Sequence, residues 1–203
     1  MKPIVTERLI IREFRPSDLG EIYRILDVEL KFIDSLQQDS SIGQRKKWLD
    51  WTIQSYEQNR LLLNPPYGDH AIVLKDSMQM IGACGFVPVL APLGLVPYYR
   101  YIADAKESEQ NYPEVGIFFA VSSHYQCRGF AHEAASALIQ YGFEKLKLSR
   151  IVGITHLYNN PSMAVLKRLG MRIEKLPHHK WMQVVGILEN NENDIQKLKN
   201  KSA

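Results

Sequence analysis

Two apolar segments with a helical pattern between them place the strongest constraint on the fold of this chain. Residues 114–121, EVGIFFAV, form a nearly continuous apolar run, and residues 150–158, RIVGITHLY, form a second one. Such runs are typical of strands that are buried on both faces of a sheet. Between them, Ala134, Leu138 and Tyr141 are candidate core positions of a helix. The sequence therefore predicts a strand–helix–strand crossover, and with it an α/β fold.

Further strands and helices are expected on both sides of this crossover, from alternating and from helical apolar patterns. The expected strands are 5–14, 70–75, 79–89, 171–176 and 181–188, and the expected helices are 15–26, 42–59, 131–147 and 161–170. In the last helix, Asn160 is the expected N-cap before Pro161, and Gly170 is the expected stop. Residues 88–113 are rich in proline and lack periodicity, which predicts a long loop or an irregular hairpin.

Length and charge suit a globular protein of one domain. The chain has 203 residues, of which 45% are hydrophobic and 23% are charged, so we expect a single domain over 1–203. A polar, charged tail is expected at about 189–203. The net charge of +3 comes without a basic run, which argues against nucleic acid as a partner.

The two cysteines and the N-terminal sequence indicate in which cellular compartment the protein is expected. Cys84 and Cys127 fit neither a metal-ligand spacing nor a disulfide framework, so we expect no metal and a reducing environment. No apolar stretch is long enough to span a membrane, and the N-terminus lacks the apolar core of a signal peptide. We therefore expect a cytoplasmic protein that does not bind membranes.

The turn before the central helix has the sequence QCRGFA, residues 126–131. A helix N-terminus offers unpaired backbone N–H groups and the positive end of the helix dipole, and both favour a phosphate. Gly129 lets the backbone approach such a ligand, while Gln126 and Arg128 add side-chain donors. Ala131 has a small side chain, which leaves space for a ligand at the first turn of the helix. These residues alone leave two interpretations equally open, an anion site and a polar turn with a solvated arginine.

QCRGFA resembles the Q/R-x-x-G-x-G/A signature of the GNAT superfamily of acyl-CoA-dependent N-acyltransferases, with Gln126, Gly129 and Ala131 at the specified positions. Residues 6–23, TERLIIREFRPSDLGEIY, resemble the opening strand and helix of the branch related to ribosomal-protein N-terminal acetyltransferases. Residues 159–171 match the family pattern N-x-x-S-x-x-V-L-x-x-L-G-[FM]. The resemblance covers nearly the whole chain and is weakest in the proline-rich loop.

The resemblance implies the GNAT fold, a mixed and curved sheet with a central splayed strand pair flanked by helices. It also implies acetyl-CoA as the cofactor and a primary amine as the acceptor, on a small molecule or a protein N-terminus. The backbone N–H groups of the turn would hold the pyrophosphate of coenzyme A, and the thioester oxygen would face a backbone N–H at the end of the first apolar run. The implied cofactor-binding residues are Ala120, Val121, Gln126, Cys127, Arg128, Gly129, Phe130, Ala131, Asn159 and Ser162.

The attacking amine must be neutral, so a base or a desolvating site has to remove its proton. Glu114 is the candidate base because it begins the central strand, and the alternative is a solvated carboxylate at a strand start. His124 and His156 are weaker candidates. Many GNAT members place an acidic tyrosine where this chain has Leu166. Ser162 is therefore the candidate hydrogen-bond donor to the leaving thiolate, unless it only satisfies helix N–H groups.

Other functions stay open at this point. Without the tyrosine, a non-catalytic acyl-CoA-binding or sensing protein with the same fold is the alternative, and a ribosome-associated role is disfavoured by the weak charge. Tyr98, Tyr99 and Tyr101 are candidates to line an acceptor pocket, although surface packing explains each of them as well. The last expected strand could pair with a second copy in a homodimer.

Overall fold

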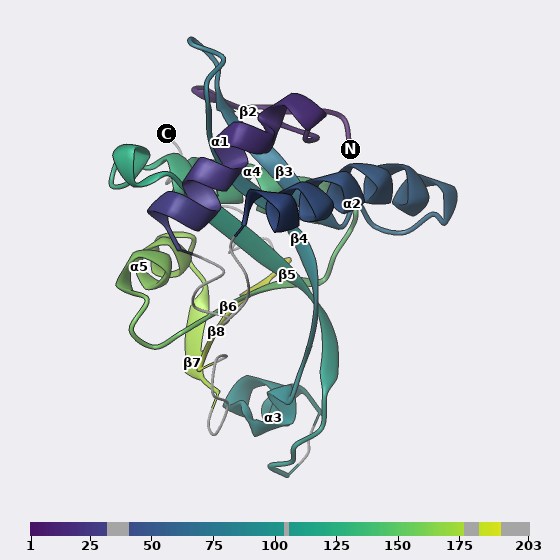
Figure 1. The fold of residues 1–203 in the computed structure, drawn as a ribbon. Coiled ribbons are helices and arrows are strands. Elements are labelled where there is room, and N and C mark those ends of the chain that lie inside the picture. The colour runs from purple at the N-terminus through teal and green to yellow at the C-terminus, as the bar shows by residue number, and fades with distance from the viewer. Residues whose placement is uncertain (32–40, 104–105, 177–182, 192–203) are drawn as a thin grey trace. The chain divides into compact units, whose positions relative to one another are not determined.

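The computed structural model describes residues 1–31, 41–103, 106–176 and 183–191 (Figure 1). Its sheet has eight strands in the order β1-β2-β3-β4-β5-β6-β8-β7. The strands are β1 (Ile4–Val5), β2 (Leu9–Arg12), β3 (Gly68–Leu74), β4 (Met80–Ala91), β5 (Tyr112–Val121), β6 (Arg150–Thr155), β7 (Arg172–Lys175) and β8 (Val184–Glu189). The α-helices are α1 (Leu19–Tyr23), α2 (Ile42–Leu61), α3 (Pro97–Ala103), α4 (Phe130–Glu144) and α5 (Asn160–Arg168). The expected α/β class is confirmed.

The chain divides into two compact units. The first comprises Met1–Phe86 and Phe118–Leu138, and the second comprises Val87–Ile117 and the described residues from Ile139 on. Strands β4 and β5 and helix α4 each contribute residues to both units.

In the first unit, β1, β2, β3 and β4 pair in antiparallel fashion in sequence order. Helices α1 and α2 lie side by side across these strands (Figure 1). Their apolar faces pack on alternate residues of the strands, as the two-residue period of a strand requires. The buried core comprises Phe14, Ile22, Ile25, Leu26, Leu49, Tyr56, Ala71, Val73, Met80 and Ala83.

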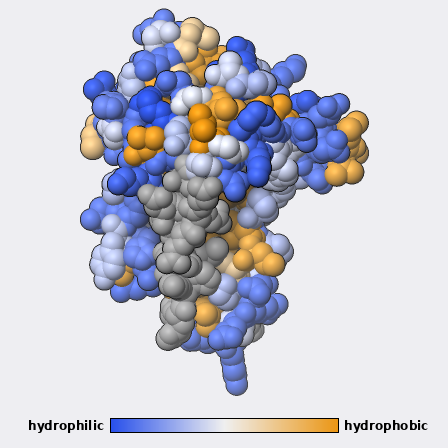
Figure 2. Space-filling model, in the orientation of Figure 1, coloured by the Kyte–Doolittle hydropathy of each residue, from blue (hydrophilic) through white to orange (hydrophobic). Residues whose placement is uncertain are grey.

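Helix α2 shows how the sequence sets this packing. Ser41 caps its start, since the Ser41 hydroxyl accepts the Gln44 N–H at 3.3 Å. The buried side chain of Arg45 donates to both carboxylate oxygens of Asp27 at 2.7 and 2.8 Å, so this charge in the core is paired. The other end of α2 carries three exposed leucines, Leu61–Leu63, which form an apolar surface patch (Figure 2).

In the second unit, β5 and β6 run parallel, with Gly116 opposite Val152. Strand β8 then pairs antiparallel with β6 on one side and with β7 on the other. Helix α5 packs closely on β6, because a Cβ atom added to Gly153 would lie 2.5 Å from Leu166 Cδ2. The buried core comprises Ala91, Leu93, Val96, Tyr98, Tyr99, Val152, Leu176, Val185 and Ile187.

One sequence expectation was wrong, and the structure adds a helix to a second. Residues 5–14 form two strands and not one, because the hydroxyl of Thr6 accepts the Leu9 N–H at 2.9 Å and closes a turn between them. Residues 88–113, expected to form a long loop or an irregular hairpin, contain the end of β4, helix α3 and the start of β5, and β5 lies beside β4 in the sheet. Tyr98 and Tyr99 of this helix are buried and pack edge to face, with ring centroids 5.1 Å apart. Burial of aromatic rings thus stabilises a helix that periodicity did not indicate.

The other expected elements are present with shifted ends, and the strand expected to reach residue 158 ends at Thr155. Residues 181–182 of the last expected strand, and the tail from residue 192 on, lie outside the described residues. Among the described helices, none combines the length and the apolar character that a membrane span needs.

Candidate functional site

The turn between β5 and α4 has an unusual backbone geometry. Cys127 and Gly129 both adopt left-handed conformations, with φ of 59° and 82°. Residues in this region can turn successive backbone N–H groups toward one side and so form a concave nest for an anion. The carbonyl of Gly129 accepts the Glu133 N–H at 3.0 Å, so the helical ladder of α4 begins at the turn. In an α-helix, the first backbone N–H groups have no partner within the helical ladder and can bind an anion.

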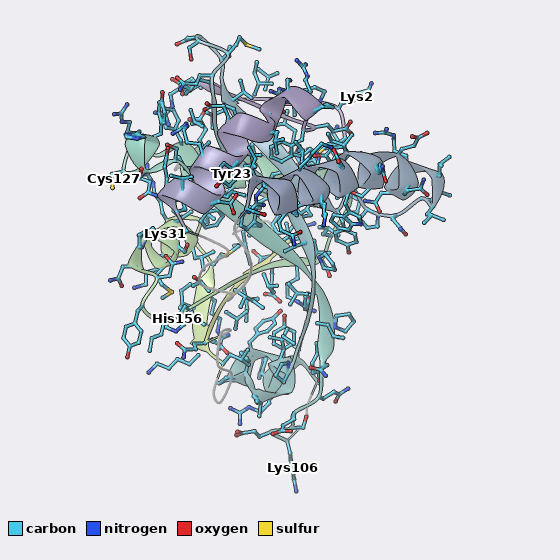
Figure 3. All side chains as sticks on the ribbon, viewed as in Figure 1. Lys2, Tyr23, Lys31, Lys106, Cys127 and His156 are labelled. Atoms are coloured by element: carbon cyan, nitrogen blue, oxygen red, sulfur yellow. The ribbon has the colours of Figure 1, made fainter. Side chains whose placement is uncertain are left out.

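The side chains of the turn have separate roles. The amide of Gln126 donates to the Val121 carbonyl at 3.1 Å, which ties the turn back to the end of β5. The guanidinium of Arg128 lies over the ring of Tyr125, 5.5 Å from its centroid. Cys127 is an exposed free thiol that projects from the surface (Figure 3). Of the two side chains predicted as donors, Gln126 is thus engaged in a bond that shapes the turn.

Arg8 and Glu133 support the turn, and the sequence analysis missed both. Glu133, in the first turn of α4, accepts hydrogen bonds from Thr6 Oγ1 at 2.6 Å, Arg8 N at 2.9 Å and Arg8 Nε at 2.7 Å. Burial opposes the charge of Glu133, but the bonds from Thr6 and Arg8 outweigh it and lower the pKa of this carboxyl. Arg8 Nη1 also donates to the carbonyl of Arg128 at 3.1 Å.

Glu29 holds the start of the turn and was also missed. It ends the π-helical segment Arg24–Glu29, a type of segment that is frequent at functional sites. Its Oε2 accepts from Ser122 Oγ at 2.7 Å, Ser123 N at 3.0 Å and Ser123 Oγ at 3.1 Å. The side chain is 9% exposed and is also paired with Arg24. More than 90 residues separate Glu29 from these serines, so no local spacing could indicate the contact.

Glu114, the candidate base, is the counter-ion of Arg150 in the second unit. Arg150 Nε donates to Glu114 Oε1 at 2.9 Å, Nη2 donates to the same oxygen, and the Glu114 side chain is 6% exposed. Burial opposes the charge of Arg150, yet its hydrogen bonds with Glu114 and Tyr98 raise its pKa further. The hydroxyl of Tyr98 in turn donates to Glu189. This network joins α3 to three strands and favours a structural role for Glu114.

Helix α5 corrects one sequence expectation. Its N-cap is Asn159 and not Asn160, because Asn159 Oδ1 accepts the Ser162 N–H at 3.2 Å across the three-residue span that a cap requires. Asn160 is the first residue of the helix, directly before Pro161. Leu166, the residue discussed above in place of a tyrosine, is buried and packs in the core.

The predicted site residues fall into the two units. Ala120 and Val121 share the first unit with the turn at 126–131, whereas Glu114, Asn159 and Ser162 belong to the second. His124 Nε2 lies 3.9 Å from Glu29 Oε1, and His156 Nδ1 accepts the Tyr158 N–H at 3.3 Å. Within the described parts of the chain, no three His, Cys, Asp or Glu side chains gather in a way that could hold a metal ion.

Comparison with known proteins shows the family. The model of the acetyltransferase (GNAT) domain matches residues 8–172. The N-acetyltransferase YnaD of Bacillus subtilis, itself uncharacterised, is 30% identical over 175 residues, which are 84% of this chain and 83% of that protein. A GNAT-family acetyltransferase from Bacillus anthracis superposes with a TM-score of 0.68 at 19% identity, over 94% of this chain and 99% of the other.

The ribosomal-protein-S5-alanine acetyltransferase of Vibrio fischeri has the same fold, with a TM-score of 0.66 at 17% identity over 95% of this chain and 98% of its own. The turn at the head of α4, the strands and helices around it and the family match all point to one assignment. The chain belongs to the GNAT family of acetyl-CoA-dependent acetyltransferases.

Proposed function

We propose that this protein transfers an acetyl group from acetyl-CoA directly to a primary amine, on a small molecule or on a protein N-terminus. The observation that carries the proposal is the turn at the head of α4, in which Cys127 and Gly129 both have left-handed backbones. Oriented backbone donors at a helix N-terminus are suited to a diphosphate. The family match supplies the class of reaction.

The residues of the turn fit coenzyme A. At Gly129, a Cβ atom would meet only the Arg8 side chain, with Nη2 at 3.4 Å, so the backbone at this position is little crowded. The N–H groups from Cys127 to Ala131 would hold the pyrophosphate, and Arg128 adds a positive charge beside it. Bound there, acetyl-CoA supplies the acetyl group, whose C–S bond breaks as a C–N bond to the amine forms.

The protein would contribute positioning and desolvation more than strong acid–base chemistry. Leu166 cannot donate a proton, and Glu114 already binds Arg150. We keep a backbone N–H near Ala120 or Val121 as the proposed donor to the thioester oxygen. Asn159 and Ser162 remain the proposed pantetheine and thiolate contacts. Loss of the amine proton to solvent would then complete the transfer.

The burial of Leu166 and the ion pair of Glu114 also favour a second candidate function. A buried leucine at the position of the usual acid and an ion-paired Glu114 also suit a protein that binds acyl-CoA without catalysis. Incubation with acetyl-CoA and a panel of amines, including peptides with free N-termini, separates the two by the release of free thiol. Amine-dependent thiol release supports acetyl transfer. Tight binding of coenzyme A without such release from any amine supports the binding protein.

A further inference from the structure

We propose that Arg8 is a positioning residue for the pyrophosphate of coenzyme A, and that it acts through the backbone of the turn rather than on the ligand. The inference rests on the proposed function, because it requires that residues 126–131 bind coenzyme A. Arg8 lies two residues after Thr6, in the turn between β1 and β2, far from α4 in the sequence and in contact with it in the fold.

The orientation of one peptide carries the argument. Arg8 Nη1 donates to the carbonyl of Arg128 at 3.1 Å. In a trans peptide the C=O and N–H bonds point in opposite directions, so this contact aims the Gly129 N–H away from Arg8. A Cβ atom added to Gly129 would lie 3.4 Å from Arg8 Nη2. Arg8 therefore lies on one side of the turn, and the Gly129 N–H points away from it.

The guanidinium is itself held in place. Its Nε donates to Glu133 at 2.7 Å, and its plane lies over the ring of Phe130, 4.4 Å from the centroid. The Nε atom of the guanidinium thus binds the Glu133 carboxylate, while Nη1 binds the Arg128 carbonyl. A lysine ammonium is a point charge without this fixed fork and cannot reproduce both bonds in one geometry. The structure therefore calls for an arginine here, and not merely for a positive charge.

The consequence is a defined pattern of ligand dependence. If Arg8 shapes the pyrophosphate donors, its loss should weaken every ligand that carries a pyrophosphate by the same factor. Ligands without a pyrophosphate should be unaffected. A residue that contacted the 3′-phosphate, or that only supported the fold, would give a different pattern.

Calorimetric titration of the full chain with coenzyme A, 3′-dephospho-coenzyme A and pantetheine tests this pattern. Arg8→Met removes the donors and keeps an unbranched stem against Phe130. We expect the Kd for both pyrophosphate ligands to rise equally, by roughly 10- to 100-fold, the value of a lost charge-assisted hydrogen bond. The Kd for pantetheine should not change. Arg60→Met, which removes an exposed arginine paired with Glu13, is the matched control and should leave all three values unchanged.

Each other outcome overturns the proposal. If the wild type and Arg8→Met bind coenzyme A with the same Kd, Arg8 has no positioning role, but the proposed function stands. If the wild type does not bind coenzyme A at all, both the positioning role and the proposed function are wrong. A larger loss for coenzyme A than for its dephospho form indicates contact with the 3′-phosphate, and an equal loss for pantetheine indicates a general effect on the fold. Arg8→Lys, which also serves if Arg8→Met does not fold, should bind as weakly as Arg8→Met. If Arg8→Lys binds coenzyme A with the wild-type Kd, the planar guanidinium of an arginine is not required at this position.

Discussion

Glu114 and Arg150 form a largely buried ion pair between the parallel strands β5 and β6, in which two guanidinium nitrogens share one carboxylate oxygen. The Glu114 side chain is 6% exposed and that of Arg150 is 22% exposed. Arg150 also lies over the rings of Tyr98 and Tyr99, at 5.7 and 5.2 Å from their centroids. The pair therefore anchors helix α3 as well as the two strands.

Glu114→Gln should lower stability more than activity. The substitution removes the negative partner of a partly buried arginine, which costs about 1–3 kcal/mol once the exposure of Arg150 is considered. Urea unfolding measures this loss, and the pH profile of kcat should keep its shape. If the variant folds normally but loses activity and its pH profile shifts, Glu114 is a catalytic base after all.

Glu29→Gln should weaken the turn that precedes the proposed coenzyme A site. The three hydrogen bonds from Ser122 and Ser123 would lose a charged acceptor, and we expect the free energy of unfolding to fall by about 1–3 kcal/mol. The KM for acetyl-CoA should rise in the same variant. Glu21→Gln, in the same helical region, is the control, because Glu21 is 48% exposed in its pair with Arg24 and should change stability by less than about 0.5 kcal/mol. Equal effects of the two substitutions contradict the role given to Glu29.

Two neighbouring residues of β3 should oppose each other in the pH dependence of stability. Burial, partly offset by Arg45, raises the pKa of Asp69 from 3.8 to about 6, and burial lowers the pKa of His70 from 6.5 to about 4. Between these values the folded state binds more protons at Asp69 and the unfolded state binds more at His70. As the pH rises from 4 to 6, Asp69 therefore lowers stability while His70 raises it.

Asp69→Asn should expose the contribution of His70 alone. The stability of this variant should rise with pH between about 4 and 6.5 more steeply than that of the wild type, by roughly 1–3 kcal/mol in total. At pH 7 the variant should exceed the wild type, since Asp69 Oδ1 is buried and has no hydrogen-bond partner among the described residues. Urea unfolding at several pH values measures both effects. Parallel curves for the two proteins contradict the opposed linkage.

Leu63→Gly should stabilise the end of α2. Leu63 follows the C-cap with φ of 54° and is 92% exposed, so it has backbone strain and little packing. Glycine adopts this conformation freely, and we expect a gain of about 0.5–1 kcal/mol in the free energy of unfolding. Leu62→Gly is the matched control, because Leu62 is also exposed but has φ of −85° and should give no gain. A thermal melt that ranks the two variants alike argues against a strained cap.

The sequence predicted the parts of this fold that depend on local pattern. The buried strands around α4, the helix α2 and the turn at 126–131 follow from apolar periodicity and turn residues. Helix α3 was missed because Tyr98 and Tyr99 stabilise it through tertiary burial, in a segment whose prolines suggested a loop. The cap at Asn159 was assigned one residue too late, since two adjacent asparagines offered the same local signal.

The supports of the candidate site could not be predicted in this way. Arg8 and Glu133 are 125 residues apart, and Glu29 and Ser122 are 93 residues apart. From the neighbouring sequence alone, Arg8 is a polar residue near a strand, and Glu29 is an acidic residue in a helix. Their contacts arise only when the strands pair and bring the turn at the head of α4 against the N-terminal segments.

Binding of coenzyme A to Gly129→Val tests the central claim most directly, with Gly170→Val as the matched control. Both glycines have left-handed backbones, with φ of 82° and 84°, so both substitutions bring similar strain. Only Gly129 lies in the turn. Titration calorimetry should show the Kd for coenzyme A rising by about tenfold or more in Gly129→Val, a loss of at least ~1.4 kcal/mol, and unchanged in Gly170→Val. An unchanged Kd in a folded Gly129→Val protein would contradict the assignment of the turn to coenzyme A.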